Sequence, residues 1–320
     1  LLGLFVFKGP QAYNLSTIKS QKGFVFLAPC VEEGCGFVNC GKLISEVWNL
    51  YVAGNTTHYP QGEIYSSRQA HFKGHLNYFQ GPLTIKEHLR IHTLHKWGLS
   101  YCPTVFETCP SVTFAFDMGK QLNQPLESPE TELTLEGPSI TVTKPFTVKE
   151  IKGDTPKISF IFQEDFTLTS PIQAKGELLI QAPSVVAKKK IQADQVLIGS
   201  TKGDITLEAF VEGTEKVLLN TAENLTYPAE GLQTLGLLHL ILPPYRRLEI
   251  PLKLLGQLRI EAPDFRNVTT LEARKGIEIL TNSHLKNIWK WSLVNIGKII
   301  SDEGDIVFQG NVFQGDESEV

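Results

Sequence analysis

The feature that most constrains this chain is an internal repeat of short, strand-like segments. Residues 172–183 read IQAKGELLIQAP. The core of this segment recurs in degraded form at residues 255–263 (LGQLRIEAP), and its opening recurs at residues 191–198 (IQADQVLI). Repeats of this kind are typical of solenoids, in which each short unit buries its apolar face against its neighbours. The repeats therefore constrain the architecture before any single residue is considered.

A second pair of repeats lies near the two ends of the chain. Residues 17–27 and 270–280 share the pattern Thr-φ-x-small-x-Lys-Gly-φ-x-φ-φ, where φ is apolar. Residues 39–45 (NCGKLIS) and 295–301 (NIGKIIS) then follow in the same order. Short alternating runs indicate half-buried strands, and Gly marks the sharp bends because a left-handed backbone costs it least. The same two-strand module is therefore predicted near each end.

The barest form of the repeat is Gly-Asp followed by a short strand, at residues 202–207 (KGDITL) and 303–308 (EGDIVF). A period of about 20 residues suits a coil whose turns stack about 4.8 Å apart in parallel sheets. Helical 3-4-7 spacing is nearly absent after residue 130. The predicted fold is all-β, a parallel β-helix. Its predicted axis is filled by Ile205, Leu207, Ile277, Ile279, Ile306 and Phe308.

Residues 58–125 depart from this pattern. Six of the eight histidines lie here, aromatic residues are dense, and two cysteines close the region. Residues 86–97 (KEHLRIHTLHKW) suit either a short helix or an irregular strand. The prediction is therefore β-helix rungs over residues 1–57 and 126–320, separated by an irregular insertion over 58–125.

Insertions in solenoids map to loops on one face, which is often the binding face. The aromatic and histidine side chains of the insertion are therefore the candidate binding residues. A helix over residues 86–97 would place three of the histidines on one side, as in a zinc site or a pH-sensitive patch. It lacks the Glu partner of His-Glu-x-x-His enzymes, so polar residues without a metal are the favoured interpretation. The predicted binding residues are Tyr78, Phe79, His88, His92, His95 and Trp97.

Composition and the number and spacing of the cysteines limit the classes of protein to which this chain could belong. The 320 residues are 42% hydrophobic and 20% charged, as in a soluble globular protein, and the net charge of −4 argues against nucleic-acid binding. The five cysteines lack the spacing of a zinc ribbon, and their odd number leaves one unpaired within the chain. Disulfides of an exported protein are the favoured interpretation, with reduced core thiols or metal ligands as alternatives. The candidate disulfide cysteines are Cys30, Cys35, Cys40, Cys102 and Cys109.

The pattern N-φ-G-x-I-x-(S/A)-x-x-G-D-φ-x-φ resembles the repeats of filamentous haemagglutinin-like exoproteins, the adhesins and contact-dependent inhibition effectors of two-partner secretion systems. It is carried by residues 192–209, 270–279 and 295–308. The resemblance implies a right-handed parallel β-helix at the bacterial surface or in the medium. It also implies export by an outer-membrane transporter and attachment to a receptor or glycan on a host or target cell. The Asn-Pro-Asn motifs of the secretion domain are absent, so a shaft segment of a longer protein is expected.

The expected function is non-enzymatic, without a cofactor. A carbohydrate-active β-helix enzyme is the main alternative, because such enzymes set carboxylates along a groove beside a basic residue. The candidates for that role are Asp194, Asp204 and Glu208, with Lys202 or Arg246 as the base. The Gly-Asp pairs are better interpreted as turns, since Asp bonds its own backbone in tight bends. A purely structural spacer is the third interpretation. Asn39 and Asn295 are expected in hydrogen-bonded ladders along the coil.

Overall fold

A computed structural model describes residues 4–28, 36–95, 98–244, 246–281, 293–310 and 312–314 of the chain. The described residues form 40 β-strands and no helix, and so include none that could span a membrane. The strands build a parallel β-solenoid of about 13 turns, which confirms the predicted fold class. The chain divides into two compact units, Leu1–Ile158 and Ser159–Val320.

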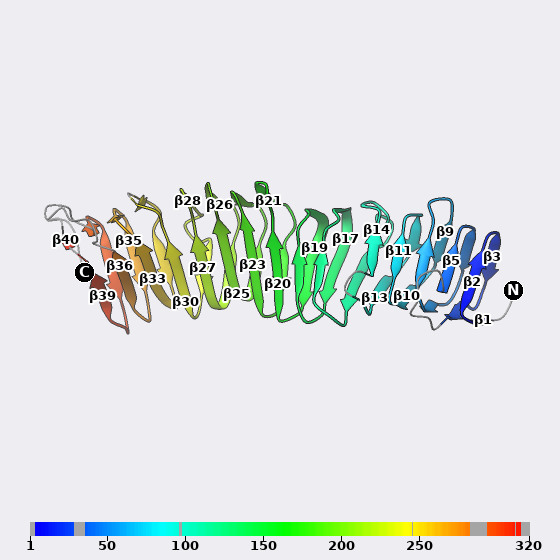
Figure 1. Cartoon of the computed structure of the whole chain (residues 1–320). Helices are drawn as coiled ribbons and strands as arrows, with labels where there is room; N and C mark the ends of the chain where they lie inside the picture. The colour runs from blue at the N-terminus through cyan, green and yellow to red at the C-terminus, as the bar shows by residue number, and fades with distance from the viewer. Residues whose placement is uncertain are drawn as a thin grey trace. The chain divides into compact units, whose positions relative to one another are not determined.

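The first unit stacks its strands in three parallel sheets, which we name A, B and C (Figure 1). Sheet A contains β1 (Phe5–Lys8), β4 (Phe24–Leu27), β7 (Leu50–Ala53), β10 (Gln69–Gly74), β13 (His88–Thr93), β15 (Ser111–Phe116), β16 (Lys120–Leu122), β17 (Leu126–Glu136), β18 (Ile140–Val142) and β19 (Phe146–Asp154). Sheet B contains β2 (Gln11–Asn14), β5 (Gly36–Asn39), β8 (Thr56–His58), β11 (Asn77–Phe79) and β14 (Leu99–Tyr101). Sheet C contains β3 (Thr17–Ser20), β6 (Lys42–Ser45), β9 (Glu63–Ser66) and β12 (Leu83–Ile85).

The second unit has one long sheet and three shorter ones, which we name D, E, F and G. Sheet D contains β20 (Lys157–Ile161), β22 (Ile172–Ala174), β23 (Glu177–Ala182), β25 (Ile191–Ser200), β27 (Val211–Asn220), β29 (Leu232–Thr234), β30 (Leu237–Ile241), β33 (Gln257–Ala262), β36 (Ile277–Thr281) and β39 (Ile306–Gln309). Sheet E contains β21 (Phe166–Leu168), β24 (Val185–Ala187), β26 (Ile205–Leu207) and β28 (Leu225–Thr226). Sheet F contains β31 (Arg246–Leu248), β34 (Phe265–Asn267), β37 (Leu293–Asn295) and β40 (Val312–Gln314), and sheet G contains β32 (Leu252–Leu254), β35 (Thr270–Ala273) and β38 (Lys298–Ser301).

Alternation along each strand decides which side chains enter the core. Successive side chains of a strand point to opposite faces, so a parallel stack in register turns each inward position into a column. In the first unit one inward column is apolar and at most 1% exposed on six consecutive coils: Leu50, Ala70, Leu89, Val112, Leu133 and Ile151. The corresponding column of the second unit is equally buried: Leu178, Val196, Val217, Leu238, Leu258 and Ile277.

Four of the six predicted axis residues are confirmed as core. Ile205 and Ile279 are fully buried, and Leu207 and Ile277 are at most 2% exposed. Ile306 and Phe308 are only half-buried. Their strand, β39, has a paired neighbour on one side only among the described strands, so its inward face is covered from that side alone.

Residues 58–125 do not form the irregular insertion that we expected. Strands β10 and β13 pair in parallel over six consecutive positions, and β15 continues the same ladder. Four of the six histidines here, His58, His71, His88 and His92, lie on ordinary strands of the coil, and His75 and His95 lie in the bends between strands. The helix considered for residues 86–97 is instead strand β13 up to Thr93, followed by a turn.

One real departure from the coil occurs between β14 and β15. A chain of turns takes the place of a fifth strand in sheet C, with main-chain bonds from Val105 to Cys102 and from Cys109 to Phe106. Phe106 is fully buried and its ring lies 5.5 Å from that of Phe114. The loop therefore fills the core with an aromatic side chain where the neighbouring coils use a strand.

The two end modules fold alike, as their sequences predict. Gly23 and Gly276 precede β4 and β36 in the left-handed region, with φ of 92° and 121°. A Cβ on Gly41 would lie 2.0 Å from the Ser16 carbonyl oxygen, and a Cβ on Gly297 would lie 1.9 Å from the corresponding oxygen of Thr269. Both turns are therefore closed to any side chain.

Inward-facing asparagines at the ends of sheet B and sheet F strands form the predicted ladders. The Asn14 side chain donates to that of Asn39 over 2.7 Å, and the Asn267 side chain donates to that of Asn295 over 2.8 Å. In the first unit the ladder continues to His58, whose Nδ1 accepts from the Asn39 amide at 3.1 Å. Its Nε2 donates to the Pro82 carbonyl at 3.2 Å. Burial lowers the pKa of His58, so the neutral ring is an internal link of the ladder.

Candidate binding face

The outward face of sheet A carries three columns of polar side chains across β10 to β19. Because the strands are parallel and in register, residues of equal position stack directly above one another. The first column is Gln69, His88, Ser111, Glu132 and Glu150. The second is His71, Arg90, Thr113, Thr134 and Lys152, and the third is Lys73, His92, Ala115, Glu136 and Asp154. We call this surface the sheet A face.

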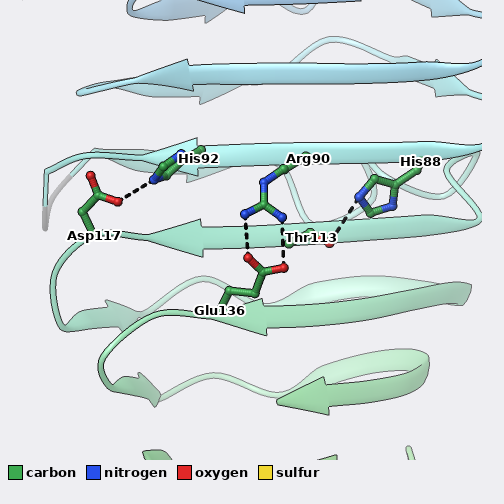
Figure 2. A network of polar contacts seen from close by, with 6 residues as sticks. All are labelled: His88, Arg90, His92, Thr113, Asp117 and Glu136. Carbon is green, nitrogen blue, oxygen red and sulfur yellow. Dashed lines mark hydrogen bonds and ion pairs between the residues drawn. The ribbon is translucent and has the colours of Figure 1, made fainter. Parts of the chain in front are cut away.

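Strand β13 supplies the centre of this face (Figure 2). The Arg90 guanidinium reaches across β15 to the Glu136 carboxylate and makes two bonds, of 2.9 and 2.6 Å. The small side chain of Ala115 lies beside this bridge, in register between His92 and Glu136. Such bidentate pairs fix orientation as well as charge. Arg90 is therefore held in one position on the face.

The two histidines on either side of Arg90 are also anchored. His88 Nδ1 lies 2.9 Å from the Ser111 hydroxyl, and its Nε2 lies 3.3 Å from the Thr113 hydroxyl. His92 Nε2 lies 2.6 Å from a carboxylate oxygen of Asp117. All of these partners are on β15 or directly after it, which places the six side chains of Figure 2 on three consecutive coils.

Two imidazoles of the face are held neutral near pH 7. Burial, and then the charge of Arg90, lowers the pKa of both His71 and His88. The pKa of His71 falls to about 4, helped by His92 and Lys73. The His71 ring lies 5.2 Å from that of Tyr51 in an edge-on arrangement, and its Nε2 is buried without a hydrogen-bond partner. A neutral ring of this kind can still donate a hydrogen bond to a ligand, or accept one from it, through its other nitrogen, Nδ1.

The structure brings together only two of the six predicted binding residues. His88 and His92 are on the sheet A face, while Tyr78 points outward from sheet B and His95 is exposed in the turn after β13. Phe79 is fully buried and packs 5.0 Å from Phe72, so it belongs to the core. Trp97 lies outside the described residues.

The strand geometry also separates the histidines that a helix would have grouped. His88 and His92 are four residues apart on an extended strand, which separates their Cα atoms by about 13 Å and is too far for one metal ion. Within the part of the chain that the structure describes, no three His, Cys, Asp or Glu side chains gather as metal ligands.

The cysteines of the described chain are thiols. Cys40, Cys102 and Cys109 are free, so the structure does not join the last two in a disulfide. Burial raises the pKa of the Cys109 thiol to about 11, and its Sγ donates to the Leu83 carbonyl at 3.6 Å. Cys30 and Cys35 lie outside the described residues.

Two of the three carboxylates considered for an enzyme, Asp194 and Asp204, accept hydrogen bonds from neighbouring coils. Asp194 accepts hydrogen bonds from the Gly176 main chain and the Thr214 hydroxyl, at 2.9 and 3.0 Å. Asp204 accepts from the main chain and side chain of Asn224, at 2.8 and 2.9 Å. Both carboxylates therefore join neighbouring coils: Asp194 lies within β25, and only Asp204 belongs to a Gly-Asp pair, at the bend before β26.

Sequence reasoning overlooked His71, Lys73 and Arg90. The signal was present, because residues 69–74 (QAHFKG) and 88–93 (HLRIHT) both alternate polar and apolar with a period of two. Had these segments been interpreted as neighbouring strands, the alternation would have placed the histidines, Lys73 and Arg90 on one outward face.

Searches of protein families, characterised proteins and solved structures gave no match to this chain. What the sheet A face could bind is therefore inferred from its side chains alone. It combines fixed hydrogen-bonding groups, one bidentate ion pair and neutral imidazoles on a flat surface. That combination suits the binding of a polar partner.

Proposed function

We propose that this chain is a non-enzymatic binding segment, the β-helical shaft of an exported, haemagglutinin-like bacterial surface protein. It attaches to a receptor or glycan on a host or target cell through the sheet A face. Export through an outer-membrane transporter and display at the cell surface are part of the same proposal. The repeat pattern of residues 295–308 supports the family, and the polar columns of sheet A support the binding role.

The observation that carries the proposal is the order of the network around Arg90. Its ion pair with Glu136 and the bonds of His88 and His92 fix three neighbouring side chains on one strand. Groups that are fixed before binding lose little conformational entropy when a partner arrives. Proteins maintain such a surface at some cost, because half-buried charges need well-placed partners.

The groups on the face suit a partner rich in hydroxyl and carbonyl groups. Neutral imidazoles and hydroxyls both donate and accept hydrogen bonds, whereas Arg90 and Lys73 only donate. The edge of Tyr51 beside His71 adds an apolar contact at the margin. An oligosaccharide presents the matching pattern of hydroxyls over a small apolar ring face.

The proposal is tested by attachment of the purified chain to immobilised neutral and acidic oligosaccharides and to whole cells. The triple variant His88→Gln, Arg90→Gln, His92→Gln should weaken attachment at least tenfold. Lys42→Gln, on the outward face of sheet C, is the control and should leave attachment unchanged, and Tyr78→Ala tests the predicted residue on the outward face of sheet B. Circular dichroism of each variant should show the β-sheet spectrum of the native chain.

Equal attachment by the native chain and the triple variant would contradict the role of the sheet A face. Loss of attachment in Tyr78→Ala alone would move the binding site to sheet B. No attachment of the native chain to any surface would favour a structural spacer.

A further inference from the structure

A cavity of about 650 Å³ opens in the second unit where sheet E ends and sheet F begins. Strands β27 and β30 of sheet D are paired, so the segments that follow them, β28 and β31, lie on consecutive coils. These two strands are not paired with each other. Pro228 follows Tyr227 after β28, and residues 243–244 before β31 are both proline. Proline has no N–H for a sheet ladder, so neither β28 nor β31 is extended through these flanking residues.

The walls of the cavity carry an excess of arginine. Three guanidinium groups and two carboxylates line it. Arg247 and Arg266 are register partners on adjacent strands, so two side chains of like charge leave the sheet from backbone positions about 4.8 Å apart. Adjacent like charges on a sheet are destabilising unless a counter-charge lies near. The lining residues are Glu223, Asn224, Leu225, Thr226, Tyr227, Leu242, Arg246, Arg247, Leu248, Glu249, Ile250 and Arg266.

Arg246 occupies a position that is normally apolar. It is the register partner of Phe265, which is 1% exposed and belongs to the core. The Arg246 Nε atom is buried and has no hydrogen-bond partner. Arg247 pairs with Glu249, but among the described residues no carboxylate lies within ion-pair distance of Arg246 or Arg266. A buried donor without an acceptor is costly, and a guanidinium is always charged.

The remaining walls give the cavity a fixed shape. Tyr227 is 3% exposed, and its hydroxyl donates to the Ile250 carbonyl at 2.8 Å, which joins the two sides of the break. Leu242 and Leu248 are at most 4% exposed and provide an apolar floor. A concave, partly apolar space of this size with a few convergent polar groups is typical of a small-molecule site.

We propose that this cavity binds a small organic oxyanion, a phosphate ester or a carboxylate, whose charged oxygens accept from Arg246 and Arg266. The planar guanidinium fork matches both oxyanions in two-bond geometry. The ligand accepts from the terminal guanidinium nitrogens of Arg246, which are not buried, and neutralises Arg266 beside the ion pair of Arg247 and Glu249. Its carbon skeleton packs against Leu242 and Leu248. This site is separate from the sheet A face and does not depend on the adhesive function.

Titration calorimetry of the full chain at low ionic strength tests the site. The probes are inorganic phosphate, glycerol 3-phosphate and succinate, which separate the phosphate and carboxylate classes and reveal whether the apolar floor contributes. At least one probe should bind with a 1:1 stoichiometry. Arg246→Gln should weaken that binding at least tenfold, and Leu242→Trp, which fills the cavity, should abolish it.

Arg259→Gln is the matched control, since Arg259 lies on the outward face of sheet D and pairs with Glu261 and Glu278. It removes the same charge and should leave probe affinity unchanged. If Arg246→Gln fails to fold by circular dichroism, Arg266→Gln replaces it, because this exposed side chain is not part of the core. The proposal is overturned if no probe binds the folded native chain. It is overturned equally if Arg259→Gln weakens binding as much as the cavity variants do.

Discussion

Inward-facing polar residues are the most informative single positions in this solenoid. The Asn39 side chain is fully buried, yet it accepts from Asn14 and donates to the Gly41 carbonyl and to His58. Each bond joins a different coil or closes the turn after β5. Because a buried polar group without a partner is costly, these bonds also penalise any slip of one coil against the next.

Replacement of Asn39 should therefore destabilise the folded chain. Asn39→Ala leaves the His58 Nδ1 without its partner and removes the shorter of the two bonds that the Asn14 amide donates, so it should lower the free energy of unfolding by about 2–3 kcal/mol. Asn49→Ala, at an exposed position just before β7, should change it by less than about 0.5 kcal/mol. The measurement is the urea midpoint at constant m-value. Similar shifts for the two variants would show that the ladder contributes little.

The buried imidazoles make stability depend on pH. The pKa of His71 is about 4 in the folded chain and about 6.5 in the unfolded chain, so the unfolded state binds the proton first as pH falls. The contribution of His71 to the free energy of unfolding is therefore fully present above pH 6.5 and is lost progressively as the pH falls to about 4. His58 and His88, whose pKa values are also lowered, act in the same direction.

The variant His71→Gln isolates that contribution. Between pH 7.5 and 4.5 the native chain should lose more free energy of unfolding than the variant, because glutamine does not titrate. Urea unfolding at four or five pH values gives both curves. Parallel curves would mean that His71 is protonated in the folded chain at the same pH as in the unfolded one.

At the scale of elements, the repeated modules could be predicted from the sequence. The choice between a helix and a strand for residues 86–97 could not. The matched glycines of residues 17–45 and 270–301 predict the same strand-turn-strand unit, because each glycine marks a bend that other residues cannot make. Residues 86–97 satisfy a helical spacing of histidines and a period of two at once. Only the neighbouring strands β10 and β15, which offer a ladder on both sides, decide between them.

The same limit applies to the candidate site. His88 and His92 were identifiable as polar residues in a distinctive segment, but their grouping with His71 and Glu136 depends on register between coils. Register is set by contacts far apart in the sequence, which local patterns do not contain. The prolines beside the cavity of the second unit can be seen in the sequence. The sequence does not show that the segments next to them lie on consecutive coils.

The equivalence of the end modules has a direct energetic consequence. Gly41→Ala and Gly297→Ala both force a Cβ against a carbonyl oxygen of the previous coil, so each should destabilise the chain by about 1–3 kcal/mol. Gly199→Ala is the control, since its nearest neighbour would lie 4.0 Å away, and it should be close to neutral. Thermal or urea unfolding of the three variants provides the comparison. A destabilising Gly199→Ala with a neutral Gly41→Ala would contradict the turn geometry.

At the scale of the whole molecule, stability is built from contacts between adjacent coils. Each of the two compact units has its own apolar columns and its own short sheets. In such solenoids the free energy is close to a sum of coil and neighbour terms, so a local defect weakens the coils beside it most. A binding site can then lie on any stretch of the surface whose coils are well packed, as we propose for the sheet A face.

The sheet A face and the cavity of the second unit both depend on parallel coils stacked in register. In the second unit one outward column of sheet D runs from Leu179 through Leu197 and Arg259 to Val307. Spin labels at cysteines introduced there, in a chain whose five native cysteines are replaced, allow pulsed-EPR distances to be measured. The pair Leu197→Cys and Arg259→Cys, three coils apart, should give Cα atoms about 14 Å apart, and the pair Leu179→Cys and Val307→Cys, six coils apart, about 29 Å. Distances that do not rise with the number of coils, as in antiparallel hairpins, would contradict the stacked parallel architecture.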